Sequence, residues 1–115
     1  MPPRASKAAQ RQAIDLASVF SALGDRTRLR LVAVLCAGGA FSIAQLTAGT
    51  DVTRQAVTRH LRTLADAGLV KDLKVGRERL WQFEPAAAEE ARRSLEAVGR
   101  RWEQALGRLK ASLEG

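Results

Sequence analysis

The segment TRQAVTRHLRTLADAGLV, residues 53–70, carries the side chains best suited to chemistry with another molecule. It contains three arginines and has no carboxylate before Asp66. At about 100° per residue, a helix here would place Val57, Leu61 and Leu64 in one narrow arc. The polar side chains would group on the other side: Thr53, Arg54, Gln55, Thr58, Arg59 and Arg62. The segment therefore predicts a helix with one buried face and one exposed cationic face.

The exposed face has the chemistry of a surface that binds double-stranded DNA. Thr, Gln and Arg side chains offer donors and acceptors that match base edges and phosphates, and a helix fits the major groove. A carboxylate would repel the phosphate backbone, so the acid-free face favours the same interpretation. For the helix taken alone, a solvated surface that is merely basic remains an equal alternative.

The residues before this helix predict the elements that would position it. Asp25 is suited to cap a helix of about residues 26–37, and Ser42 followed by Gln45 matches a capping box that opens a short helix. A tight connection follows, and Thr53 caps the next helix. A short helix, a turn and a second helix with a polar outer face indicate a helix-turn-helix, whose second helix reads DNA.

After Gly68 the pattern changes from helical to strand-like. The runs LVKDLKV and RLWQF are separated by Gly76 and predict a two-stranded hairpin. Lys74, Arg77 and Arg79 lie close to its turn, where they could contact phosphates. Two basic elements would then flank one surface, which favours DNA binding over an ordinary basic surface.

An apolar stripe in the last predicted helix, about residues 86–113, indicates dimerisation. Its members recur at steps of three and four: Ala87, Ala91, Leu95, Val98, Trp102, Leu106, Leu109 and Leu113. A domain of this size cannot cover such a stripe, but a second copy of the helix, with a first helix at about 9–23, could. We expect a dimer interface of Ile14, Phe20, Leu95, Val98, Trp102, Leu106 and Leu109. The alternative is that the stripe folds back on its own domain.

The combination resembles the ArsR/SmtB family of bacterial winged helix-turn-helix repressors over about residues 16–84. ALGDRTRLRLVAVL resembles the stretch before the helix-turn-helix, residues 53–70 the recognition helix, and VGRERLWQF the wing. The resemblance implies a mainly α fold with a small β-hairpin and with N- and C-terminal dimerisation helices. It also implies that Thr53, Arg54, Gln55, Thr58 and Arg59 face an operator and that Arg77 reaches the backbone or the minor groove. Since a dimer presents two recognition helices, the expected operator is an imperfect palindrome.

Many members of this family are metal sensors, which need several converging Cys, His, Asp or Glu ligands. This chain has one Cys and one His, so we expect no metal site and no cofactor. His60 sits where the family often has histidine, and we expect a structural or phosphate-contacting role. Cys36 aligns with Leu29 and Val32 on the predicted helix, which favours a buried small hydrophobe over a redox switch. A small-molecule or redox effector stays open.

Length, composition and charge limit the classes of protein to which the chain can belong. With 115 residues, 46% of them hydrophobic and 27% charged, the chain should fold as one domain over residues 9–115, with its DNA-reading core at about 25–84 and a mobile tail at 1–8. A formal charge of +7 favours polyanionic partners. The absence of a secretion signal and of a bilayer-spanning run predicts a cytoplasmic protein with no membrane partner. No phosphate loop or nucleophile and base arrangement points to an enzyme.

The preferred interpretation is a homodimeric, sequence-specific transcriptional regulator that represses by occupying promoter DNA. A non-specific architectural DNA-binding protein is the first alternative. The second is a protein interaction module, in which the long helix recruits another protein and DNA contact is secondary.

Overall fold

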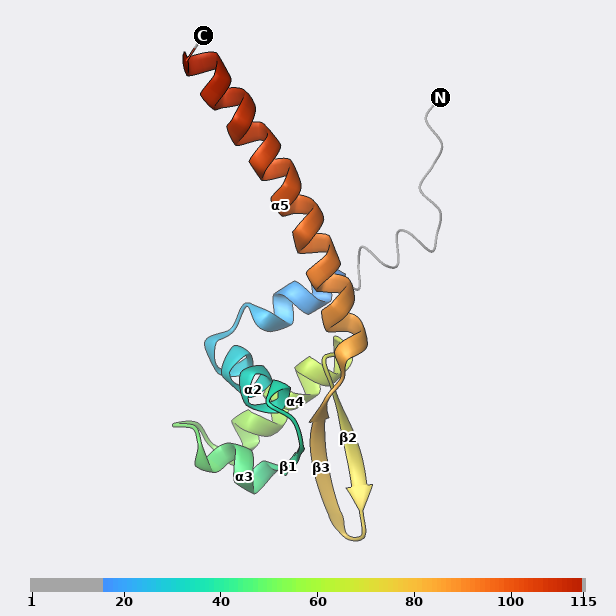
Figure 1. Cartoon of the computed structure of the whole chain (residues 1–115). Helices are drawn as coiled ribbons and strands as arrows, with labels where there is room; N and C mark the ends of the chain where they lie inside the picture. Colours follow the sequence, from blue (N-terminus) through green and yellow to red (C-terminus); the bar gives the residue numbers. More distant parts are fainter. Residues whose placement is uncertain (1–15, 115) are drawn as a thin grey trace, which may run out of the picture.

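The computed structural model describes residues 16–114 (Figure 1). A helix over residues 16–23 is followed, in chain order, by α2 (Arg26–Cys36), β1 (Ala40–Ser42), α3 (Ile43–Ala48), α4 (Arg54–Asp66), β2 (Val70–Val75), β3 (Glu78–Phe83) and α5 (Pro85–Glu114). The predicted mainly α, winged helix-turn-helix fold is confirmed. The expectations for the tail at 1–8, for Ile14 and for the start of the first helix fall outside the described residues.

Three helices begin where the sequence predicts, because each has a side-chain cap. The Asp25 carboxylate accepts a hydrogen bond from the Arg28 backbone N–H at 3.0 Å. Ser42 and Gln45 form the reciprocal capping box, with distances of 3.1 Å and 2.9 Å. Thr53 Oγ1 accepts from the Ala56 backbone N–H at 3.1 Å. A lost cap of this kind costs about 1 kcal/mol, so these residues fix the register of the helix-turn-helix.

The core lies between the helices and the small sheet. Val57, Leu61 and Leu64 of α4 are fully buried, as their spacing predicts. Burying one such side chain contributes roughly 1.5–3 kcal/mol, so α4 is held by its apolar face. The other members are Val19, Ala22, Leu31, Val32, Leu35, Leu46, Leu69, Val70, Trp81 and Ala91.

The sheet has three antiparallel strands in the order β1-β3-β2, with Leu73 opposite Leu80 and Phe41 opposite Trp81. The predicted hairpin is confirmed, and Gly76 takes a positive φ of 62° at its turn. The prediction missed β1. Three residues are too few to show the alternation that marks a strand, and β1 forms only because β3 offers an edge.

The buried face of α2 differs from the prediction. Leu31, Val32 and Leu35 face the core, whereas Leu29 is 53% exposed and Cys36 is exposed. Leu29 and Leu31 lie about 200° apart around a helix, so they belong to opposite faces of α2. Because both faces carry apolar residues, only packing against the other elements decides which face is buried. The preferred interpretation of Cys36 as a buried hydrophobe is therefore wrong.

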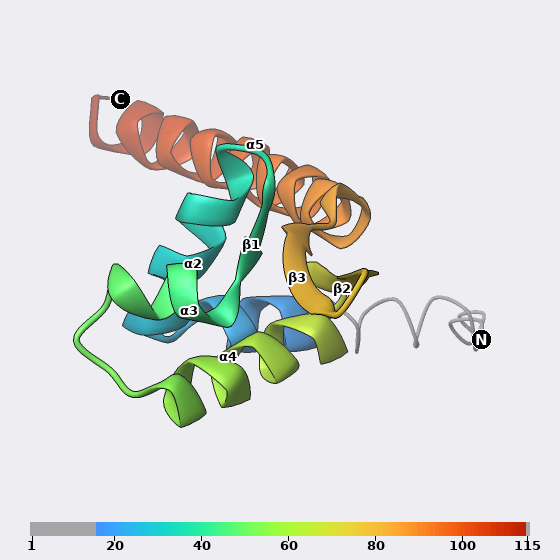
Figure 2. The same ribbon diagram turned by 90° about the horizontal axis from the view of Figure 1, so that it is seen from below.

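Helix α5 extends well beyond the body of the molecule (Figure 1). It touches the core near its start, through Ala87, Ala88 and Ala91, and residues 100–114 are exposed. Figure 2 shows α4 at one edge of the body and α5 at the opposite edge. None of the helices described here is long and apolar enough to cross a bilayer.

Candidate nucleic-acid interface

The outer face of α4 carries the predicted polar residues in the predicted place. Thr53, Arg54, Gln55, Arg59 and Arg62 are exposed, while Thr58 is half-buried. Within residues 16–114 none of the three arginines forms an ion pair. The first carboxylate of α4 is Asp66, at the C-terminal end of the helix. The face therefore presents uncompensated positive charge, and a polyanion can bind it without first breaking an ion pair.

The two threonines on this face are already engaged in hydrogen bonds with the backbone. Thr53 Oγ1 accepts from the Ala56 N–H, as the helix cap. Thr58 Oγ1 donates to the Arg54 carbonyl at 2.8 Å. The Thr58 hydroxyl can then offer only its lone pairs and its methyl group to a ligand. The side chains of Arg54, Gln55 and Arg59 donate no hydrogen bond to residues 16–114 and are better placed to select a partner.

The wing carries a second group of basic side chains. Lys74 and Arg79 are exposed cross-strand partners on β2 and β3, and Arg77 is exposed at the turn that joins these strands. Arg79 Nε lies 3.3 Å from Asp72 Oδ2, an ion pair that the sequence analysis did not foresee. Arg79 is compensated within the hairpin, whereas Lys74 and Arg77 form no ion pair with residues 16–114 and carry the available positive charge of the wing, beside the exposed carboxylate of Glu78.

His60 lies at the edge of the buried face of α4, half-buried, and contacts α2. Its Nδ1 is 3.2 Å from Arg28 Nη1 and 3.9 Å from Asp25 Oδ2. The hydrogen bond from the Arg28 backbone N–H holds the pKa of Asp25 below its ordinary value. His60 thus has polar partners inside the domain. Arg28 is a residue that the sequence analysis missed, since no local pattern reveals a contact 32 positions away.

The expected dimer residues are exposed within the single chain. Leu95, Val98, Trp102, Leu106 and Leu109 of α5 are between 49% and 64% exposed, and Phe20 is 37% exposed. Ile14 lies outside the described residues. The alternative in which the stripe folds back on its own domain does not agree with this exposure. An apolar stripe of this length on a protruding helix marks an interaction surface.

The described part of the chain offers no arrangement for binding a metal. Among residues 16–114 no group of three or more His, Cys, Asp or Glu side chains is placed to hold an ion. The surface formed by α4 and the wing is instead suited to electrostatic and hydrogen-bonding contacts with phosphates and base edges.

Comparison with known proteins supports this assignment. Residues 23–72 match a family described as a helix-turn-helix domain. The HTH-type transcriptional regulator Rv2034 of Mycobacterium tuberculosis is 36% identical over 87 residues, which cover 76% of this chain and 78% of that protein. An ArsR-like transcriptional regulator from Rhodococcus sp. RHA1 has a TM-score of 0.71 at 37% identity, covering 85% of this chain and 92% of that one.

A third relative shares the fold at lower identity. The homodimeric winged helix-turn-helix DNA-binding domain Mb0332 from Mycobacterium bovis has a TM-score of 0.65 at 21% identity. The match covers 92% of this chain and 94% of that one, so the architecture is shared along almost the whole chain.

Proposed function

This chain belongs to the ArsR family of winged helix-turn-helix transcriptional regulators, and on that basis we propose that it is a homodimeric repressor occupying an imperfect palindromic operator. Its DNA-binding helix-turn-helix makes it a transcriptional regulator. Repression follows if the bound dimer excludes other proteins from a promoter. As a DNA-binding regulator it would act in the cytoplasm.

Helix α4 enters the major groove in this proposal. Its exposed arginines have no ion-pair partner in the described chain, and Gln55 projects from the first turn with its amide free. An amide can bind adenine through two hydrogen bonds, and Arg can do the same with guanine. Gln55, Arg54 and Arg59 would therefore select sequence, while Arg62 and the two threonines would contact the backbone or flanking bases.

The wing contacts the phosphate backbone or the minor groove beside α4. Arg77, exposed at the turn, reaches farthest, and Lys74 follows it on β2. Arg79 contributes less than Arg77, because Asp72 compensates its charge. These contacts supply affinity for any duplex rather than sequence selection.

Dimerisation brings two copies of α4 to one duplex. The exposed stripe of α5, with Phe20, pairs with the same surface of a second copy and covers side chains such as Trp102, which is 64% exposed in one chain. Two recognition helices related by a two-fold axis would read successive major grooves about 34 Å apart. The homodimeric state of the structural relative Mb0332 supports this arrangement.

The observation that carries the proposal is the outer face of α4, which bears three exposed residues of cationic type (Arg54, Arg59 and Arg62) and no carboxylate before Asp66. It is tested by titrating a labelled duplex taken from upstream of the protein's own coding sequence against a scrambled duplex. We expect a preference of well over tenfold for the former. Equal affinity would favour the architectural protein instead. No binding at low salt, with another protein co-purifying, would favour the interaction module.

A further inference from the structure

The side chain of Arg28 joins three helices. Arg28 belongs to α2, and its Nε donates to the Ala22 carbonyl at 2.7 Å, at the end of the helix over residues 16–23. Its Nη2 donates to the Ser21 carbonyl of the same helix at 3.5 Å. Its Nη1 lies 3.2 Å from His60 Nδ1 on α4. One guanidinium thus links the first helix, which bears Phe20, to the recognition helix.

The chemistry of each contact suits arginine. The last carbonyls of a helix lack partners within it, and a cation near that end is favourable. A guanidinium has five N–H donors in a rigid plane and no acceptor, so it can serve several acceptors at once. Because Arg28 can only donate, His60 Nδ1 is the acceptor in this contact. A lysine carries its three donors on a single nitrogen and lacks this planar spread of N–H groups.

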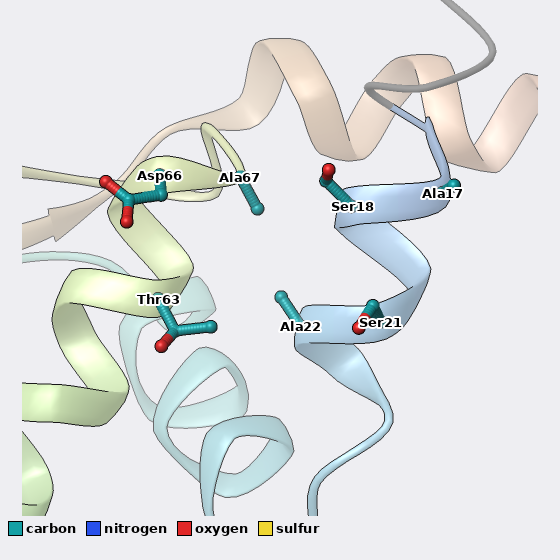
Figure 3. Close-up of a pocket in the computed structure, with 7 residues that line it drawn as sticks. All are labelled: Ala17, Ser18, Ser21, Ala22, Thr63, Asp66 and Ala67. Carbon is teal, nitrogen blue, oxygen red and sulfur yellow. The ribbon is translucent and has the colours of Figure 1, made fainter.

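Apolar packing does not by itself fix the angle between these two helices. Between them lies an open surface groove of about 480 Å³, lined by Ala17, Ser18, Ser21, Ala22, Thr63, Asp66 and Ala67. Figure 3 shows Thr63 and Ala22 facing one another across it. Val57, Leu61 and Leu64 anchor α4 in the core, and Val19 and Ala22 anchor the first helix in the same core, but burial is non-directional. Within residues 16–114 the directional link between the two helices is the hydrogen bonding through Arg28.

We propose that Arg28, through His60, is a positioning residue that fixes α4 relative to the first dimerisation helix and thereby sets the half-site spacing that the dimer accepts. This inference rests on the proposed function, since it requires two copies of α4 on one duplex. Two-fold symmetry doubles any displacement within a subunit. Because base pairs lie about 3.4 Å apart along the duplex, a shift of roughly 1.7 Å in each subunit changes the spacing by one base pair.

The experiment selects bound duplexes from a random-sequence library with the full chain and with four variants. Arg28→Ala removes all three links, and His60→Ala removes only the link to α4. In His60→Asn the amide oxygen takes approximately the place of Nδ1 and can accept from Arg28. Arg30→Ala is the matched control, because Arg30 is exposed on the same helix and forms no ion pair with the residues described here. Circular dichroism confirms that each variant is folded.

We expect the wild-type chain, Arg30→Ala and His60→Asn to enrich paired half-sites at one spacing. Arg28→Ala and His60→Ala should enrich the same half-site sequence but lose about fivefold in preference for that spacing over its neighbours, the scale of one net hydrogen bond. A role limited to stability would lower affinity for all spacings alike.

Two results would overturn the inference in distinguishable ways. If the wild-type chain enriches no paired half-sites, the proposed function fails and the inference with it. If it does, and His60→Ala keeps the wild-type spacing preference, the inference alone fails. His60→Ala decides the matter even if Arg28→Ala does not fold, because the contacts of Arg28 with Ser21 and Ala22 remain in that variant.

Discussion

Arg79 and Asp72 form an ion pair on the wing, with Nε and Oδ2 3.3 Å apart, so the hairpin carries a compensated arginine near Arg77, which pairs with no carboxylate of residues 16–114. Both partners of the pair are more than half exposed, and such pairs are worth little in isolation. Near DNA, however, the Asp72 carboxylate both repels phosphates and competes with them for Arg79. If the wing contacts DNA as proposed, we expect the pair to lower its affinity.

Replacing Asp72 with Asn should strengthen binding to every duplex by a similar factor, about two- to fivefold at low salt, because a repulsive charge is removed and Arg79 is released. Arg77→Ala is the opposing comparison: it should weaken all duplexes and lower the salt slope by about one unit. Fluorescence anisotropy titrations at several salt concentrations measure both effects. Unchanged affinity in both variants would exclude the wing from the interface.

Gln55→Ala should erode discrimination between an operator and a scrambled duplex by about 1–3 kcal/mol, because an amide that binds a base through two hydrogen bonds is lost. Competition titration with the two duplexes gives this difference directly. Gln104→Ala removes the same side chain from α5 and serves as the control. Unchanged discrimination in Gln55→Ala would show that Gln55 does not read a base.

Trp102→Ala should weaken the dimer. Trp102 is 64% exposed in one chain, and its burial between two copies contributes a few kcal/mol at most, so we expect a dissociation constant raised about ten- to hundredfold. Sedimentation velocity over a concentration series measures the constant. Glu103→Ala changes an exposed neighbour that lies off the stripe and should leave it unaltered. If the wild-type chain is monomeric, the apolar stripe of α5 is not a dimer interface.

Asp25→Asn should make the free energy of unfolding less dependent on pH in the acid range. The pKa of Asp25 is lowered in the folded state from the ordinary value of 3.8, chiefly because its carboxylate accepts the Arg28 backbone N–H. Its stabilising contribution is therefore complete above 3.8 and is lost as the pH falls below that value toward the folded pKa. Asparagine still caps the helix but does not titrate.

The measurement is urea unfolding of both proteins at a series of pH values. The difference in free energy of unfolding between wild type and Asp25→Asn should be largest near neutral pH and should shrink below 3.8. A difference that stays constant across this range would mean that the carboxylate is not selectively stabilised in the folded state.

Local patterns in the sequence were sufficient to predict α4, its caps and the hairpin. The spacing of Val57, Leu61 and Leu64 is compatible with only one buried face of a helix. Thr53, the N-cap, marks where that helix begins. Such patterns could not predict contacts between residues that are far apart in the sequence. The α2 helix has two apolar arcs, and only its neighbours decide that Leu31 is buried.

In the candidate site, too, local features were predictable from the sequence and long-range contacts were not. Its exposed cationic face follows from the helical period of residues 53–66. The ion pair of Arg79 with Asp72 needs the strand register, and the contact of Arg28 with His60 needs the packing of two helices. Compensation of charge and positioning of α4 are therefore properties of the fold that residue spacing does not reveal.

The central claim is that two α4 helices of one dimer occupy successive major grooves on the same face of a duplex. Dimethyl sulfate protection of guanine N7, an atom that lies in the major groove, tests this most directly on a duplex enriched by selection. We expect two protected clusters about 10 base pairs apart, both lost when Trp102→Ala is present at concentrations where it is monomeric. A single protected cluster, or complete reactivity of N7 in a saturated complex, would contradict the claim.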